Sequence, residues 1–468
     1  MKIEQIYTGC IAQAAYYLES KGEAAIFDPL REVQPYLARA LKDNAKIKYI
    51  FETHFHADFV SGHLDLAKKT GAHIVYGPTA NPSFEAHIAA DGEEFTVGSY
   101  TIKAIHTPGH TLESTCYLLS EDGIAKGIIT GDTLFIGDVG RPDLAQALTS
   151  ELTQEVLASH LYDSLRNKIM TLPDSLIVYP SHGAGSACGK NMSKETTDLL
   201  GNQKQTNYAL RANMTKEEFI AELLDGLSAP PAYFPQNVMM NIQGYQSLDT
   251  VLQKGSVALS AAEFLAVAKE NEALVLDVRH EDDFVKEHVP GSIFIGLNGQ
   301  FAPWVGALIM DVNQPLVLVT PEGKEEETVT RLARVGFDNT LGYLNGGIAA
   351  WKEAGYETDT IRSISPETFA SELAENQKMV VDSRRPGEFD GGHVLNAVNI
   401  PLDFINQQLA EVPKDYDFYL HCAGGYRSVI MASILKARGY HNMINVEKGF
   451  GGIKNTAVKT TAVQPACS

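Results

Sequence analysis

Short apolar runs alternate with stretches of helical periodicity along the first half of the chain. Runs of four or five mostly apolar residues are typical of β-strands, and they recur at 24–27, 47–51, 72–76, 101–105, 127–130 and 175–179. Helical spacing of apolar residues appears between them, for example over 60–69 and 150–169. This mixture predicts a layered α/β domain, to which we assign residues 1–245. A proline-rich stretch at 228–235 is typical of a stiff connector or a packed extended arm.

Beyond residue 255 the sequence repeats itself. The segment 274–279 (LVLDVR) matches 379–384 (MVVDSR), and His288 matches His393 at the same offset. Each copy alternates strand-like and helix-like runs, which favours a small α/β module with a parallel sheet. We expect two such domains, at residues 255–357 and 362–468.

Composition narrows the class of protein. The chain has 468 residues, long enough for two to four domains, with 44% hydrophobic residues and a net charge of −20. That charge repels nucleic acid and argues against a metal-dependent nuclease. No signal peptide is visible, and no apolar run reaches about 18 residues, so no membrane span is expected. The cysteines are too few and scattered for a disulfide framework, which fits a reducing cytoplasm: Cys10, Cys116, Cys188, Cys422 and Cys467.

A motif at residues 53–58, Thr-His-Phe-His-Ala-Asp, follows a strand-like run and predicts a metal site. Imidazoles and a carboxylate at alternate positions after a strand can converge on one cation, and neutral imidazole suits zinc or iron. Further ligand types follow other runs at loop-like positions. The candidate ligands are His54, His56, Asp58, His110, Asp132 and His182.

A second centre of chemistry is predicted in the later copy. Cys422 lies between a strand-like run and a helix-like run, where the helix dipole and loop N–H groups stabilise a thiolate. Gly424 and Gly425 let the loop curl around the sulfur, and Arg427 adds a positive charge. The earlier copy has Thr-Pro-Glu-Gly-Lys-Glu-Glu-Glu at 320–327 and lacks both the thiol and the arginine. We therefore expect catalysis only in the later copy, with the earlier one a spacer or docking surface.

These residues carry two family resemblances. The segment from Cys422 to Arg427, with Asp-Ser-Arg at 382–384 upstream, resembles a rhodanese sulfurtransferase domain. The six candidate ligands resemble the metal motif of the metallo-β-lactamase superfamily, which folds as an αββα sandwich. In domain order the chain is similar to fused persulfide dioxygenase–sulfurtransferases. The resemblance implies an α/β protein with an N-terminal metallo-β-lactamase sandwich followed by an inactive and an active rhodanese-like domain with parallel sheets.

One departure from the hydrolase motif refines this expectation. Dinuclear members of the superfamily have a histidine where this chain has Phe59, so a second metal site would lack a ligand. The resemblance to the persulfide dioxygenase branch implies one Fe(II) per chain, held by His54, His110 and Asp132, a facial triad with three open positions. His56, Asp58 and His182 then orient ligands or substrate. Two further residues complete the predicted site: Arg141 orients the active-site loop, and Cys188 either approaches the metal or is a buried spectator thiol.

The implied reaction is oxidation of a low-molecular-weight persulfide by O2 to sulfite and a free thiol. Cys422 would accept a sulfane sulfur from a second persulfide and pass it to sulfite, which leaves as thiosulfate. The small-molecule partners would be persulfide, O2 and sulfite, and a dimer or tetramer of identical chains is expected. Two alternatives stay open. One is a zinc-dependent thioester hydrolase of the hydroxyacylglutathione hydrolase type with an accessory sulfur carrier. The other is not an enzyme but a persulfide sensor or carrier, with Cys422 as a sulfur relay.

Overall fold

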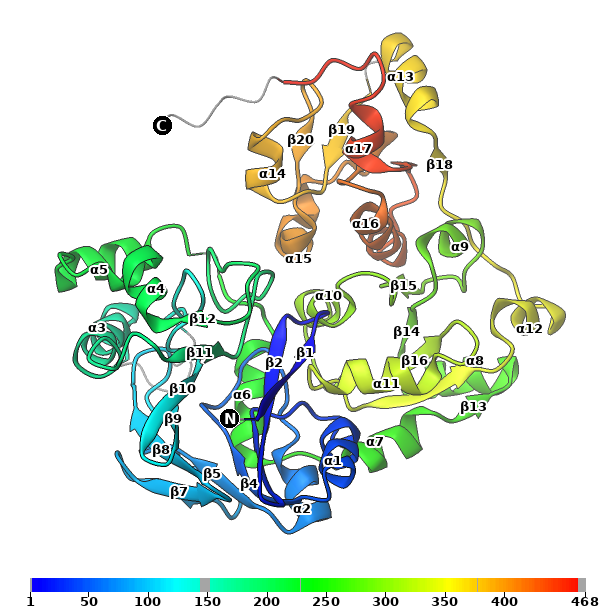
Figure 1. Ribbon diagram of the computed structural model, residues 1–468. Coiled ribbons are helices and arrows are strands. Elements are labelled where there is room, and N and C mark those ends of the chain that lie inside the picture. Colours follow the sequence, from blue (N-terminus) through cyan, green and yellow to red (C-terminus); the bar gives the residue numbers. More distant parts are fainter. Residues whose placement is uncertain (1, 144–151, 228, 377, 462–468) are drawn as a thin grey trace. The chain divides into compact units, whose positions relative to one another are not determined.

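The computed structural model describes residues 2–143, 152–227, 229–376 and 378–461. It divides into two compact units (Figure 1). The first comprises Met1–Thr250 with Thr330–Phe337, and the second comprises Val251–Val329 with Asp338–Ser468. In the described ranges no helix is both long and apolar enough to cross a membrane.

The first unit contains two six-stranded sheets. The strands of the first sheet lie in chain order: β1 (Ile3–Thr8), β2 (Gln13–Ser20), β3 (Glu23–Phe27), β4 (Lys46–Phe51), β5 (His73–Tyr76) and β6 (His87–Ile88). The second sheet has the order β12-β11-β10-β9-β8-β7, from β7 (Glu94–Val97), β8 (Tyr100–His106), β9 (Thr115–Glu121), β10 (Ile124–Gly131), β11 (Ile177–Pro180) and β12 (Asp198–Leu199). Strands β3 to β6 pair in parallel, as do β10 and β11, and the other neighbours are antiparallel.

The two sheets pack face to face through an aromatic core. Phe51 of β4 lies against Tyr117 of β9, with ring centroids 4.8 Å apart. Tyr16 of β2 meets Tyr179 of β11 edge-on at 5.4 Å. Each such pair contributes about 0.5–1.5 kcal/mol beyond the burial of its area. Buried side chains from both sheets thus form one core between the two inner layers of a sandwich.

Helices form the outer layers of this sandwich. On the first sheet, α2 packs against β4 and β5, and α1 packs against β4. On the second, a core of Leu161, Leu165, Phe219 and their neighbours covers the outer side chains of the strands, such as Ile128. The helical elements of the unit are α1 (Gln34–Lys42), α2 (His63–Thr70), α3 (Gln154–Ser164), η2 (Leu165–Ile169), α4 (Leu200–Thr206), η3 (Tyr208–Leu210), α5 (Lys216–Leu224), α6 (Phe234–Gln243) and α7 (Leu248–Gly255), which continues into the second unit.

The second unit contains two five-stranded parallel sheets with the same topology. The earlier copy has the order β13-β17-β16-β14-β15, from β13 (Ala258–Leu259), β14 (Leu274–Asp277), β15 (Ile293–Phe294), β16 (Leu316–Val319) and β17 (Thr340–Leu344). The later copy has the order β18-β22-β21-β19-β20, from β18 (Ser363–Ile364), β19 (Val380–Asp382), β20 (Val398–Asn399), β21 (Phe418–His421) and β22 (Met443–Val446). The predicted repeat is therefore a repeat of fold.

Helices flank both parallel sheets. The earlier copy carries α8 (Ala261–Glu270), α9 (Glu281–Lys286), α10 (Phe301–Leu308), α11 (Glu325–Ala333) and α12 (Gly347–Glu353). The later copy carries α13 (Pro366–Glu375), α14 (Pro386–Asp390), η4 (Leu402–Phe404), α15 (Ile405–Gln408), η5 (Leu409–Glu411), α16 (Tyr426–Ala437) and α17 (Gly449–Ile453). The α/β class, the N-terminal sandwich and the parallel sheets of the two repeats are confirmed.

One local prediction was wrong. The proline-rich stretch does not remain in an extended conformation up to residue 235. Helix α6 begins at Phe234, with Pro235 in its first turn. Proline suits this position, where its missing N–H would have no partner inside the helix. Tyr233 and Phe234 are buried, so the stretch anchors a helix. Cys467 lies outside the described residues, as do 150 and 151 of the predicted helix at 150–169, in which α3 begins at Gln154.

Candidate functional site

The loops that follow three strands meet at one edge of the sandwich. His54 comes after β4, Asp132 directly after β10, and His182 after β11. His110 joins them from the loop between β8 and β9. Because the carboxyl ends of these strands lie at the same edge, ligand types far apart in sequence converge there.

His54, His110 and Asp132 form one buried group that offers three ligand atoms within 4.8 Å of one another. Asp132 Oδ2 lies 3.5 Å from His110 Nε2 and 4.0 Å from His54 Nε2. Burial, aided by neighbouring imidazoles, lowers the pKa of His54 well below its usual value. His54 is therefore a neutral imidazole, the form that binds metals.

The hydrogen bonds of this group fit a metal ion. His110 Nδ1 donates to the carbonyl of Arg141 at 2.8 Å, which directs Nε2 toward Asp132. Within the described residues, neither His110 Nε2 nor either carboxylate oxygen of Asp132 has a hydrogen-bond partner. Two imidazoles and a carboxylate that face one another in a buried site can hold a metal ion.

His56 points into a different group. Its Nε2 lies 3.1 Å from Asp28 Oδ1 and 3.3 Å from Glu52 Oε2, and all three side chains are buried. Although burial opposes the charge, the Asp28 and Glu52 carboxylates raise the pKa of His56 well above its usual value. The ring of Phe59 lies on that of His56, with centroids 4.2 Å apart. In this structure His56 is thus an ion-pair partner of two carboxylates.

Asp58 and His182 lie together with Cys188. His182 Nε2 is 3.4 Å from Asp58 Oδ2 and 3.6 Å from Asp132 Oδ1. The buried thiol of Cys188 belongs to the same cluster. The structure therefore brings Cys188 close to the residues predicted to surround the metal.

Arg141 occupies the loop that supports these groups. Its guanidinium binds both oxygens of Asp143 at 2.6 Å and donates to the carbonyl of Ala187 at 3.2 Å. Its backbone accepts from His110 and donates to the carbonyl of Cys188 at 3.0 Å. A Cβ on the preceding residue, Gly140, would lie 2.1 Å from the carbonyl oxygen of Asp132. This loop can therefore approach Asp132 and His110 closely only with glycine at position 140.

The loop after β21 surrounds Cys422. Its Sγ accepts a hydrogen bond from the N–H of Gly425 at 3.1 Å, immediately before α16 begins at Tyr426. Gly425 has a φ of +112°, which side-chain-bearing residues rarely adopt. The curled loop and the helix N-terminus therefore direct partial positive charge at the sulfur.

The arginine of this loop is paired with a carboxylate of the same copy. Arg427 binds both carboxylate oxygens of Glu388 at 2.7 Å. This pairing raises the pKa of Arg427 and lowers that of Glu388, so both are charged and they offset each other. Sequence alone could not pair them, because they are 39 residues apart.

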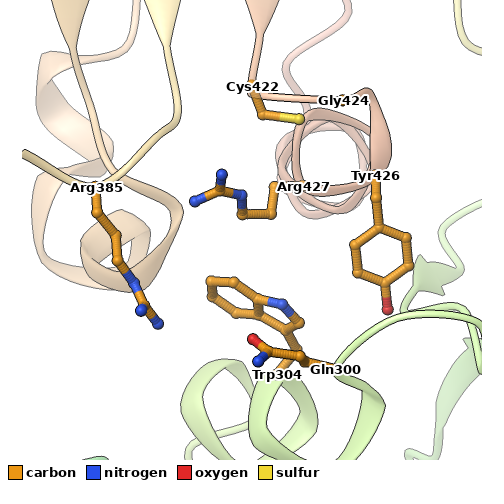
Figure 2. Close-up of a pocket in the computed structure, with 7 residues that line it drawn as sticks. All are labelled: Gln300, Trp304, Arg385, Cys422, Gly424, Tyr426 and Arg427. Carbon is orange, nitrogen blue, oxygen red and sulfur yellow. The ribbon is translucent and has the colours of Figure 1, made fainter. Parts of the chain in front are cut away.

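A pocket of about 300 Å³ opens at Cys422 (Figure 2). Arg385, Gly424, Tyr426 and Arg427 of the later copy line it. Gln300 and Trp304 of the earlier copy line the same pocket. The sequence analysis did not predict them as site residues. Nothing in the apolar run of α10 distinguishes them from core residues. The spacer or docking surface expected of this copy therefore contributes to the pocket.

Tyr426 joins the two copies at this pocket. Its hydroxyl donates to the carbonyl of Gly296 at 2.6 Å. A Cβ on Gly299 would lie 2.4 Å from the Tyr426 ring, so this side chain packs tightly on the earlier copy. The first residue of α16 is thus anchored on the earlier copy by both its hydroxyl and its ring.

Two family models match the chain. The metallo-β-lactamase superfamily matches residues 8–182, and the rhodanese-like domain matches 260–354 and 365–456. The second model thus covers both copies of the repeat, including the one without cysteine.

Three known proteins are each similar to part of this chain. A solved structure, the metallo-β-lactamase from Staphylococcus aureus, is 30% identical, has a TM-score of 0.66, and covers 74% of this chain and 99% of its own. The mitochondrial persulfide dioxygenase of Homo sapiens is 28% identical over 41% of this chain and 78% of its own length. A probable hydroxyacylglutathione hydrolase of Schizosaccharomyces pombe is 31% identical over 38% of this chain, which spans 66% of that relative.

Proposed function

Because this chain belongs to the metallo-β-lactamase superfamily and continues into two rhodanese-like domains, we propose that it is a persulfide dioxygenase fused to a sulfurtransferase. It oxidises a low-molecular-weight thiol persulfide with O2 to sulfite and thiol in the first domain. In the later rhodanese-like domain it transfers a sulfane sulfur to sulfite and releases thiosulfate. The domains are proposed at residues 1–245, 255–357 and 362–468.

The observation that carries the proposal is the composition of the first metal group. His54, His110 and Asp132 face one another, whereas His56 is engaged by two carboxylates. A site of two imidazoles and one carboxylate leaves three coordination positions for other ligands, as in non-haem iron oxygenases. A ferrous ion held there would supply the one-electron chemistry through which O2 reacts with sulfur.

Hydrogen bonds from neighbouring residues orient the two histidines of the proposed metal site. The Arg141 carbonyl fixes the tautomer of His110, and the Thr53 hydroxyl lies 2.9 Å from His54 Nδ1. The balanced reaction consumes one persulfide, one O2 and one water, and yields one thiol, one sulfite and two protons. All three ligand side chains are buried, which restricts their movement around an ion.

Cys422 carries the second half-reaction. Its thiolate attacks the terminal sulfur of a persulfide, the S–S bond breaks, and the carrier leaves as a thiolate. Sulfite then attacks the outer sulfur of the cysteine persulfide, restores the Cys422 thiolate and leaves as thiosulfate. The Gly425 N–H supports the negative sulfur in each thiolate state.

A thioester hydrolase is the second candidate, and the likeness to hydroxyacylglutathione hydrolases favours it. The engagement of His56 with Asp28 and Glu52, together with Phe59, argues against it, because these positions would have to supply imidazole ligands. The rhodanese-like domains also favour sulfur chemistry.

Oxygen uptake tests the proposal. Protein purified without air should contain about one iron per chain and consume O2 with glutathione persulfide while sulfite appears. His110→Ala should lose iron and O2 uptake together, because a facial triad has no spare protein ligand. His56→Ala should retain iron.

The matched control is His160→Ala, which changes an exposed histidine of α3 and should leave both properties intact. Absence of O2 uptake, combined with hydrolysis of S-lactoylglutathione by a zinc-loaded chain, would establish the hydrolase instead. Loss of iron in His56→Ala would contradict the ligand assignment.

A further inference from the structure

The turn at the end of α11 belongs to the first compact unit, although most of the earlier copy belongs to the second. This turn comprises residues 333–337 (Ala-Arg-Val-Gly-Phe), and all of them except Arg334 are buried. A short piece of a rhodanese-like domain is therefore part of the unit that contains the candidate metal group.

Within that unit, Asp28 orients His54 through Thr53. The Thr53 hydroxyl donates to Asp28 Oδ2 at 3.0 Å, and the Thr53 N–H donates to Oδ1 at 2.8 Å. The oxygen of the same hydroxyl accepts from His54 Nδ1 at 2.9 Å, which directs Nε2 toward Asp132. Asp28 Oδ1 also lies 3.1 Å from His56 Nε2. A displacement of Asp28 therefore changes the orientation of a proposed metal ligand.

The turn holds the segment that follows Asp28. Arg31 is fully buried, and its guanidinium donates to the carbonyl of Ala333 at 2.9 Å and to that of Gln246 at 2.7 Å. The next residue, Glu32, forms an ion pair with Arg334. Because Asp28 is close to these residues in the chain, the contacts limit the movement of its backbone.

The same turn holds the loop at residues 56–61. The N–H of Val60, a fully buried residue, donates to the carbonyl of Arg334 at 2.7 Å. Asn241 of α6 donates to two carbonyls of the loop at 2.8 and 2.9 Å, and its own oxygen accepts from the N–H of Ser61 at 2.9 Å. The peptide groups of this loop are thus fixed by α6 and by the turn.

The corresponding turn of the later copy differs in its packing. A Cβ on Gly336, which has a φ of +86°, would lie 2.7 Å from Asn237 Oδ1 and 3.0 Å from Met240 Sδ, both in α6. Gly439 occupies the equivalent position with a φ of +82°, and a Cβ there would meet no atom of the described residues within 4 Å. Both turns therefore favour glycine for their backbone conformation, and the turn of the earlier copy is in addition packed closely on α6.

We propose that the turn at residues 333–337 is a positioning element of the candidate metal group. It holds the segment after Asp28 and the loop at 56–61, and through them it fixes the orientation of His54. None of its residues is a metal ligand, and the inference does not depend on which reaction the metal group performs. The earlier copy, which lacks the thiol, thereby contributes to the metal site by supporting its loops.

Cobalt(II) added to the metal-stripped full chain tests this proposal, because its visible absorption depends on the geometry of its ligands. The absorption that is lost in His110→Ala is assigned to the candidate metal group. Gly336→Ala should weaken cobalt binding there by about tenfold and change the visible band, because the added Cβ pushes the turn away from α6. Gly439→Ala is the matched control, since it introduces the same backbone strain without a clash. It should keep the affinity and the band.

Two further variants separate positioning from folding, which is followed by thermal unfolding of the metal-free chains. Adding Asn237→Ala to Gly336→Ala removes the atom that the new Cβ meets, and it should restore part of the lost affinity. Arg31→Lys keeps the charge but cannot donate to both carbonyls in the same forked geometry, and it should also weaken cobalt binding. This milder variant carries the test if Gly336→Ala does not fold.

Two outcomes overturn the inference. One is cobalt binding with the affinity and band of the parent chain in folded Gly336→Ala or folded Arg31→Lys. The other is an equal loss in Gly336→Ala and Gly439→Ala, which would mean that backbone strain alone weakens the chain. Either result leaves the dioxygenase proposal untouched, because that proposal is tested by iron content and O2 uptake in the parent chain.

Discussion

The two rhodanese-like copies share a topology but use the same loop in opposite ways. In the later copy the N–H of Gly425 donates to the sulfur of Cys422. In the earlier copy the N–H of Gly323, at the equivalent position, donates to the carboxylate of Glu325 at 3.2 Å. The Thr320 hydroxyl, which stands where the cysteine would be, donates to the same carboxylate at 3.3 Å. A built-in anion thus occupies the loop that holds a reactive sulfur in the other copy.

The copies also divide the pocket between them. The later copy contributes the nucleophile and two arginines, and the earlier copy contributes Gln300 and Trp304. A domain without the cysteine can therefore still shape the site of its neighbour. The comparison shows that the absence of a catalytic cysteine does not make a domain a mere spacer.

The largest effect is expected at the nucleophile. Cys422→Ser should reduce thiosulfate formation to background, because a serine hydroxyl cannot carry a sulfane sulfur. O2 uptake and sulfite release should continue, since the proposed iron ligands belong to the other unit. Sulfite and thiosulfate are quantified side by side. Unchanged thiosulfate would contradict the assignment of this loop.

The next largest effect is expected on domain stability, from a buried Asp–Arg ion pair that is present in both copies. Asp382 binds Arg384 at 2.6 Å, and Asp277 binds Arg279 at 2.7 Å. Asp382→Ala should destabilise its domain by about 3 kcal/mol, because it leaves a buried guanidinium unpaired. Asp277→Ala should cost less, since Arg279 is 15% exposed and Arg384 only 6%.

Calorimetric unfolding transitions measure this difference. Asp403→Ala is the control, because its partner Arg385 is 61% exposed and such pairs contribute about 1 kcal/mol or less. Equal losses at Asp277 and Asp403 would show that the earlier copy no longer depends on its pair.

Trp304 gives a smaller effect that tests the shared pocket. Trp304→Ala should lower kcat/KM for thiosulfate formation about tenfold, which corresponds to about 1.4 kcal/mol of lost contact. Trp304→Phe should retain most of the rate. The control is Trp351→Phe, which changes the other buried tryptophan of the earlier copy, away from the pocket. A rate loss in Trp351→Phe as large as that in Trp304→Ala would indicate general destabilisation instead of a role in the pocket.

The smallest effect is expected from restoring only the thiol. Thr320→Cys in a Cys422→Ser background should form no thiosulfate above background, because Glu325 still occupies the loop and opposes a negative sulfur. The double change Thr320→Cys with Glu325→Arg should bring the earlier copy closer to activity. Turnover near the native level from Thr320→Cys alone would mean that Glu325 does not block the loop.

The sequence by itself determined the α/β class, the repeat and the places where ligand types and the thiol follow strands. These properties depend on local periodicity and on residues next to strand ends, such as His54 after β4 and Cys422 after β21. They could therefore be predicted from residues close together in the chain.

The tertiary structure alone decided which side chains meet. The approach of Cys188 to Asp58, the engagement of His56 by Asp28, and the pairing of Arg427 with Glu388 all join different loops. Trp304 reaches the pocket because two separate modules pack together. Such contacts depend on how strands and modules pack in three dimensions, and the spacing of residues along one chain carries no information on that packing.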